Sequence, residues 1–171
     1  VIASGHFVQG TFIPGVAQRT GATTYYLEIV PGAAARHASA GARPVLALNA
    51  APGEVDLMVA SELLEATRAI QAGFVTPDRT LLIASSARVF TVDEKAAMGD
   101  GRRDAAQMLE VARRFSRRAV IADLAGVAAE AKAPLSAVLL GAIAATGVLP
   151  VSAEAFRAAI ASEGKAVQAN L

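Results

Sequence analysis

The stretch Asp56–Ser86, DLMVASELLEATRAIQAGFVTPDRTLLIASS, decides the fold, because it predicts a strand, a helix and a second strand in succession. Its two ends, DLMVA and TLLIASS, are apolar runs of the length of a buried strand. Between them, Ser61–Ala72 predicts an amphipathic helix with Ser61 as its N-cap and Gly73 as its stop. Apolar strands that alternate with helices are typical of a largely parallel sheet that is covered on both faces.

The same alternation continues on both sides of this unit. Further strands are expected at Thr23–Val30, Val45–Asn49, Val89–Val92 and Val120–Leu124. Further helices are expected at Asp104–Phe115, Leu135–Thr146, Ala153–Ser162 and Gly164–Ala169. The opening VIASGHFVQGTF predicts no complete element, and Pro31–Pro44 reads as a surface loop. We therefore expect one domain over residues 1–171, a three-layer α/β/α, Rossmann-like fold with a largely parallel sheet.

The composition narrows the range of functions. Of the 171 residues, 54% are hydrophobic and only 18% are charged, which indicates either a large interior or a surface that a partner covers. The formal net charge of +1 provides no basic field, so neither nucleic acid nor a membrane surface is expected as a partner. The chain has no cysteine and so no thiolate for zinc or an iron–sulfur cluster. No signal peptide is recognisable, and a cytoplasmic location is expected.

One uncharged run, residues 133–153, is long enough to cross a bilayer. It is rich in alanine, contains Gly141 and Gly147, and is bounded by Pro134 and Pro150. These features favour a buried helix over a membrane span. A helix that is apolar all round must be enclosed by its own domain or by a partner.

Most polar candidates have a structural explanation. His6 and His37 stand at no metal-ligand spacing, so no catalytic role is expected for either. Glu62 and Glu65 fit the favourable charge of a helix N-terminus, although they could also face a crevice at the carboxyl ends of the strands. The basic cluster Ala112–Arg118, ARRFSRR, is better explained as a solvated helix end than as an RNA site.

The segment IPGVAQRTGATT is the exception. Gly15 and Gly21 free the backbone, so that its amide groups can form a nest for an anion. Between them, Arg19 offers a planar fork suited to carboxylate or phosphate, and Gln18 offers both a donor and an acceptor. The alternative is a glycine-rich connection in which Arg19 pairs with a surface acid. Both interpretations stay open on the sequence.

Several segments in order carry a family resemblance over nearly the whole chain. They are IPGVAQRTGATTYYLEI, DLMVASELLEATRAI, GFVTPDRTLLIASSARVFTVDEKAAMGDG and FRAAIASEGKAVQANL. With them the chain resembles the β subunit of indolepyruvate ferredoxin oxidoreductase and the γ domain of the 2-oxoacid:ferredoxin oxidoreductases that act on pyruvate and related acids. Family members usually open with a strand and a glycine-rich turn close to G-x-G-G-Q-G. This sequence does not show that turn, and we expect that the first strand and turn are missing from it.

The resemblance implies a role in the oxidative decarboxylation of a 2-oxoacid to an acyl-CoA, with electrons passed to ferredoxin. It implies that thiamine diphosphate, magnesium and the iron–sulfur clusters lie in a large α subunit, and that this chain binds no cofactor and has no catalytic or metal-ligating residue. The chain would then help to assemble and shape a shared site, and a homodimer is also compatible with the family. Residues expected at a subunit contact, or facing the oxoacid carboxylate or a phosphate of CoA, are Gly15, Gln18, Arg19, Thr20 and Gly21. The alternative function is a free-standing α/β module that binds an anionic metabolite without redox chemistry.

Overall fold

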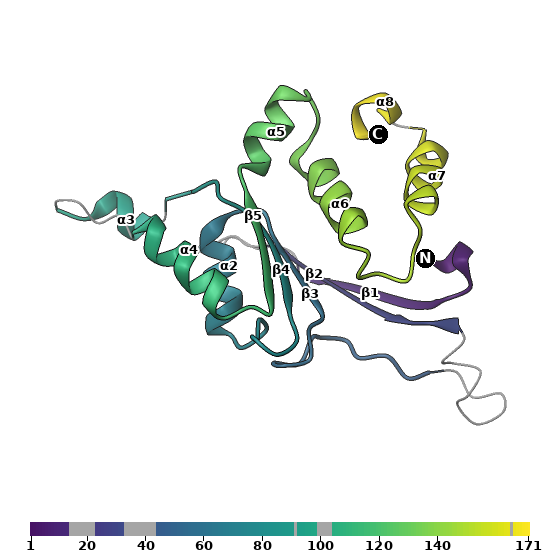
Figure 1. Ribbon diagram of the computed structural model, residues 1–171, viewed down its shortest axis with the longest axis horizontal. Coiled ribbons are helices and arrows are strands. Elements are labelled where there is room, and N and C mark those ends of the chain that lie inside the picture. Colours follow the sequence, from purple (N-terminus) through teal and green to yellow (C-terminus); the bar gives the residue numbers. More distant parts are fainter. Residues whose placement is uncertain (14–22, 33–43, 91, 99–103, 165) are drawn as a thin grey trace.

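The computed structural model describes residues 1–13, 23–32, 44–90, 92–98, 104–164 and 166–171 (Figure 1). Its strands are β1 (Phe7–Ile13), β2 (Thr24–Val30), β3 (Leu57–Ala60), β4 (Leu81–Ser85) and β5 (Arg118–Ala122). Its helical elements are η1 (Ile2–Ser4), α2 (Leu63–Gln71), α3 (Val92–Ala96), α4 (Ala105–Arg114), α5 (Leu124–Glu130), α6 (Leu135–Thr146), α7 (Ala153–Glu163) and α8 (Val167–Asn170).

The parallel sheet predicted from the opening stretch is present. β4 lies in its centre and pairs in parallel with β3 on one side and with β5 on the other. All five residues of β4 are buried, as its uninterrupted apolar sequence predicts. The helix between β3 and β4 is also confirmed, and Gly73, with φ of +77°, ends it. Its N-cap is Glu62 rather than the predicted Ser61.

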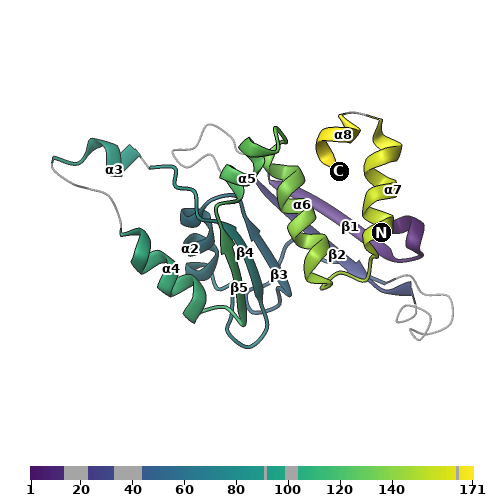
Figure 2. The ribbon, with the colours of Figure 1, turned by 45° about the horizontal axis from the view of Figure 1, so that its top comes forward.

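Helices cover both faces of this sheet, so the three-layer α/β/α prediction is confirmed (Figures 1 and 2). On one face, Leu82 and Ala84 of β4 pack in a cluster with Ala66 of α2 and Ala112 of α4. On the other face, the alternate residues of β4 pack against α5 and α6. A strand has a side-chain period of two, and β4 supplies an apolar side chain to each layer in turn.

Helix α6 has the predicted bounds, but it is only partly enclosed. Leu135, Val138, Leu139, Ala142 and Ile143 pack against the core on β4, yet no residue of α6 is fully buried. The expectation of a buried helix is therefore only half met. Among the described residues, no single helix is long and apolar enough to span a membrane. By length and composition, only α5 and α6 together pass that test, as a pair bent by 116°.

Residues 7–13 and 24–30 form a second sheet that the sequence did not predict. β1 and β2 are an antiparallel pair, with Phe7 opposite Val30 at one end and Ile13 opposite Thr24 at the other. The expectation that VIASGHFVQGTF holds no complete element is wrong. β2 is a strand as predicted, but it is not buried in the parallel sheet. Its side chains are exposed or half-buried, because it pairs only with β1 in the described structure.

Three other predictions are wrong. Val45–Asn49 is not a strand, because it forms no ladder with a neighbour and is held to β1 by side-chain bonds. The predicted strand Val89–Val92 is not formed in its described part: Val89 and Phe90 are in no strand, and Val92 begins helix α3. Leu124 does not end a strand but begins α5, a helix that the sequence pattern does not predict. Asp123 caps this helix through the N–H of Gly126 at 2.9 Å, so the short strand β5 ends before it.

Candidate functional site

The residues predicted to bind an anion or to contact a subunit lie outside the described part of the chain. They are Gly15, Gln18, Arg19, Thr20 and Gly21. Their role stays a prediction. The structure describes the strands on either side, and the last residue of β1, Ile13, lies directly opposite the first residue of β2, Thr24. The chain therefore leaves the hairpin and returns to it at the same end.

The carboxyl edge of the parallel sheet is the second candidate site, since ligands of open α/β sheets bind there. The backbone N–H of Ser86, which follows β4, donates to the carbonyl of Ala122 at the end of β5, at 2.8 Å. The N–H of Leu63, which follows β3, donates to the carbonyl of Ala87 at 3.1 Å. These two bonds join the segment that follows β4 to the end of β5 and to the start of α2.

The acids at this edge serve the fold. Glu62 makes no capping bond to its own helix; its carboxylate instead accepts a hydrogen bond from the N–H of Val89 at 2.8 Å. Glu65 forms an ion pair with Arg68, one turn along α2. Helix N-terminal charge therefore explains Glu65, whereas Glu62 ties the loop after β3 to the loop after β4.

A buried ion pair lies beyond this edge and was missed by the sequence analysis. Arg88 pairs with Glu94 of α3, and their side chains are only 11% and 3% exposed. The Arg88 guanidinium also lies 3.1 Å from Sδ of Met108 in α4 and 5.4 Å from the centroid of the Phe90 ring. This guanidinium is therefore charge-balanced inside the protein and serves to fasten α3 to α4 rather than to receive an anionic substrate.

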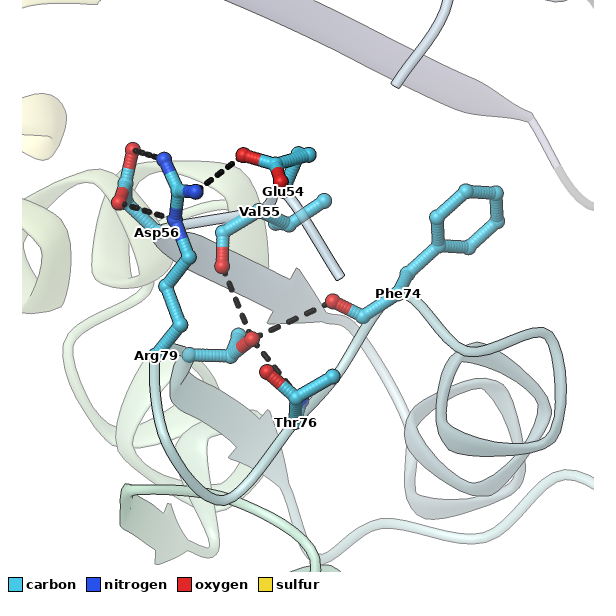
Figure 3. A network of polar contacts seen from close by, with 7 residues as sticks. Glu54, Val55, Asp56, Phe74, Thr76 and Arg79 are labelled. Atoms are coloured by element: carbon cyan, nitrogen blue, oxygen red, sulfur yellow. Dashed lines mark hydrogen bonds and ion pairs between the residues drawn. The ribbon is translucent and has the colours of Figure 1, made fainter. Parts of the chain in front are cut away.

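A second polar network closes the amino edge of the same sheet (Figure 3). Arg79, just before β4, pairs with Glu54 and with Asp56, whose Oδ1 lies 2.8 Å from Nε of Arg79. The fully buried hydroxyl of Thr80 accepts from the N–H of Thr76 at 3.0 Å and lies 2.9 Å from the carbonyl of Val55. The sequence held a signal for this cluster, because residues just before adjacent parallel strands are brought together at one edge.

Charge and hydrogen bonding shift pKa values at this amino edge. The hydrogen bond with Asp56 is the main cause of the raised pKa of Arg79. The nearby Thr76 side chain, followed by the backbone of Asp78 itself, lowers the pKa of the Asp78 carboxyl. Both shifts keep the groups charged, so neither residue is suited to give or take a proton near neutral pH.

Both ring nitrogens of His6, the one histidine among the described residues, make hydrogen bonds. In His6, Nδ1 accepts from the N–H of Gly32 at 3.2 Å, and Nε2 lies 2.7 Å from the carbonyl oxygen of Pro150, to which it donates. The imidazole thus joins the start of the chain to the connection between α6 and α7. His37 lies outside the described residues.

The basic cluster lies at a helix end, as predicted. Arg113 and Arg114 are in the last turn of α4, where cations interact favourably with the helix dipole. The guanidinium of Arg114 stacks 5.8 Å from the centroid of the Phe115 ring. Among the described residues, no three His, Asp or Glu side chains are grouped to hold a metal ion.

Comparison with known proteins decides the family. The family model described as pyruvate ferredoxin/flavodoxin oxidoreductase matches residues 1–171. The chain belongs to this family. No curated protein and no solved structure gives a significant match to it. The pyruvate ferredoxin/flavodoxin oxidoreductase match covers the hairpin, the parallel sheet and the C-terminal helices alike, which implies that the chain belongs to an oxidoreductase complex.

Proposed function

We propose that this chain is a non-catalytic, β- or γ-type subunit of a 2-oxoacid:ferredoxin oxidoreductase that acts on an aryl pyruvate such as indolepyruvate. The family match over residues 1–171 carries the proposal. The complex would decarboxylate the oxoacid, transfer the acyl group to CoA and pass two electrons to ferredoxin. This chain would assemble and shape the shared site. A cytoplasmic location, predicted from the sequence, belongs to the same proposal.

The residues of the chain do not fit the family cofactors. Iron–sulfur clusters are held by cysteine thiolates, and the sequence contains no cysteine. A thiamine diphosphate site needs oxygen ligands for its magnesium ion, and among the described residues no three His, Asp or Glu side chains are grouped to hold one. We therefore assign thiamine diphosphate, magnesium and the clusters to a companion α subunit.

Reconstitution tests this proposal. The chain should have no activity alone, and should support the CoA-dependent reduction of ferredoxin by indolepyruvate once the companion subunit is added. Replacing indolepyruvate with pyruvate tests the substrate class. Activity of the isolated chain would contradict the proposal, and so would a colourless, monomeric chain that binds an anionic metabolite and never associates with a cluster-bearing protein.

The predicted loop can be tested in the same assay. If Arg19 faces the oxoacid carboxylate or a phosphate of CoA, Arg19→Ala should raise the apparent KM for one of them at least tenfold. Arg157→Ala, which removes an exposed arginine of α7, is the matched control and should leave both KM values unchanged. Equal kinetics of the two variants would remove Arg19 from the site.

A further inference from the structure

One face of the β1–β2 hairpin is apolar, and the other is polar at its centre, between Phe7 and Val30 at one end and Ile13 and Thr24 at the other. The register of the two strands places six residues without a charge on one face, and we call them the apolar face: Val8, Gly10, Phe12, Tyr25, Leu27 and Ile29. The alternate residues at the centre of the opposite face carry hydrogen-bonding groups: Gln9, Thr11, Tyr26 and Glu28. In a sheet that covers its own core, the apolar face packs inward and the polar face meets water.

In this hairpin, the polar face is the one that contacts the rest of the chain. Nε2 of Gln9 donates to the carbonyl of Ala47 at 2.9 Å, and Oγ1 of Thr11 donates to the carbonyl of Leu48 at 2.7 Å. The carboxylate of Glu28 accepts from the N–H of Ala47 at 2.5 Å. Burial and the nearby Glu28 carboxylate raise the pKa of Tyr26 on the same face. The polarity of the hairpin is therefore inverted.

The apolar face is open to solvent at its centre and at the Ile13–Thr24 end. Phe12 is 65% exposed, Tyr25 74% and Leu27 63%. The rings of Phe12 and Tyr25, which lie opposite each other, have centroids 6.2 Å apart. A Cβ on Gly10 would approach Cδ2 of Leu27 to 3.1 Å, so the glycine lets this leucine lie across the neighbouring strand. The result is a continuous apolar surface.

An apolar surface of this kind is expected to be shielded from water by a binding partner. An isolated two-stranded hairpin is marginally stable in water, and contiguous exposed apolar patches mark interaction sites. We propose that the apolar face docks against an uncharged, apolar surface of the companion subunit. This inference rests on the proposed function and assigns one contact within that complex.

Area and charge favour the companion over a second copy of this chain. Phe12, Tyr25 and Leu27 expose on the order of 400 Å² together, because an aromatic side chain can bury about 150–250 Å². Two copies that met face to face would bury on the order of 800 Å², whereas a stable interface takes about 1,200 Å² or more. A larger partner can extend beyond the hairpin. The face also lacks charge, which is typical of the apolar core of a subunit interface.

Site-specific photocrosslinking tests the contact without disturbing the fold. p-Benzoyl-phenylalanine replaces Tyr25 in the chain, which is co-expressed with the companion subunit. The control carries the same group at Thr24, the adjacent and also exposed residue on the opposite face. Crosslinks to the companion at position 25, and at least tenfold fewer at position 24, are expected. Absence of crosslinks at position 25 in an active complex would overturn the inference and leave the proposed function intact.

Charge introduction provides a second test. Tyr25→Glu should raise the dissociation constant for the companion at least tenfold, while Thr24→Glu should change it less than twofold. Sedimentation of the isolated wild-type chain should show a monomer. A dimer that Tyr25→Glu dissociates would assign the face to a second copy and overturn the inference. If no thiamine- and cluster-bearing subunit associates with the wild-type chain, the proposed function fails together with this contact.

Discussion

The carboxylate of Glu62 accepts a hydrogen bond from the backbone N–H of Val89 at 2.8 Å, and so joins the loops that follow β3 and β4. The first prediction concerns this bond. Glu62→Ala should lower the free energy of unfolding by about 1 kcal/mol, because the Val89 N–H loses its partner. Glu62→Gln keeps an acceptor oxygen and should recover most of the loss. Denaturant unfolding measures both, and equal losses in the two variants would contradict the role of the bond.

Removing only one partner of the Arg88–Glu94 ion pair should strongly lower the free energy of unfolding. Glu94→Ala leaves the guanidinium without its carboxylate in a largely buried place, and should cost about 3 kcal/mol of unfolding free energy. The double variant Arg88→Met, Glu94→Leu removes both charges and should be more stable than the single variant. A double variant as unstable as Glu94→Ala would show that packing, rather than charge, dominates here.

The hydroxyl of Thr80 can be tested with two opposite replacements. Thr80→Val keeps the shape but removes the acceptor for the Thr76 N–H and the donor to the Val55 carbonyl. It should cost about 1–3 kcal/mol, because Thr80 is fully buried. Thr80→Ser keeps the hydroxyl and loses only a methyl group. Thermal unfolding should therefore rank Thr80→Ser above Thr80→Val, and the reverse order would exclude the hydroxyl as the stabilising group.

Two helical glycines should respond in opposite ways to alanine. Gly141, in the middle of α6, has open space where a Cβ would stand, so Gly141→Ala should stabilise the fold by about 0.5–1 kcal/mol. At Gly126 the new Cβ would collide with Oδ2 of Asp123, whose Oδ1 caps α5. Gly126→Ala should therefore bring no gain or a loss. A gain equal to that of Gly141→Ala would show that the Asp123 side chain simply turns aside.

Stability should depend on pH through Asp78. The native pKa of its carboxyl is lowered, mainly by the nearby Thr76 side chain, and so lies below the value of about 3.9 for an unfolded chain. The carboxylate therefore contributes stability above about pH 4, which is lost as the pH falls through the native pKa. Asp78→Asn should flatten the decline of unfolding free energy in this acid range. An unchanged profile between pH 5 and about pH 2 would contradict the shift.

The parallel sheet could be predicted because its signals are local. The run Leu81–Ser85 is apolar at nearly every position and buried on both faces, and Gly73 and Asp104 mark a helix end and a helix start in the sequence itself. The hairpin could not be predicted in the same way. Apolar and polar residues alternate only weakly along β1, and its strand character depends on pairing with β2. The paired residues Ile13 and Thr24 are eleven positions apart in the sequence, so the pairing is not a local signal.

The candidate sites show the same difference between features with a local sequence signal and features that depend on distant residues. Sequence alone determined what this chain does not supply, because without cysteine it offers no thiolate ligand to an iron–sulfur cluster. Only the tertiary structure decided that Arg88 pairs with Glu94 and that the hairpin presents Tyr25 outward. The physical reason is that composition and period fix which residues share a face, whereas the neighbours that meet this face come from distant parts of the chain.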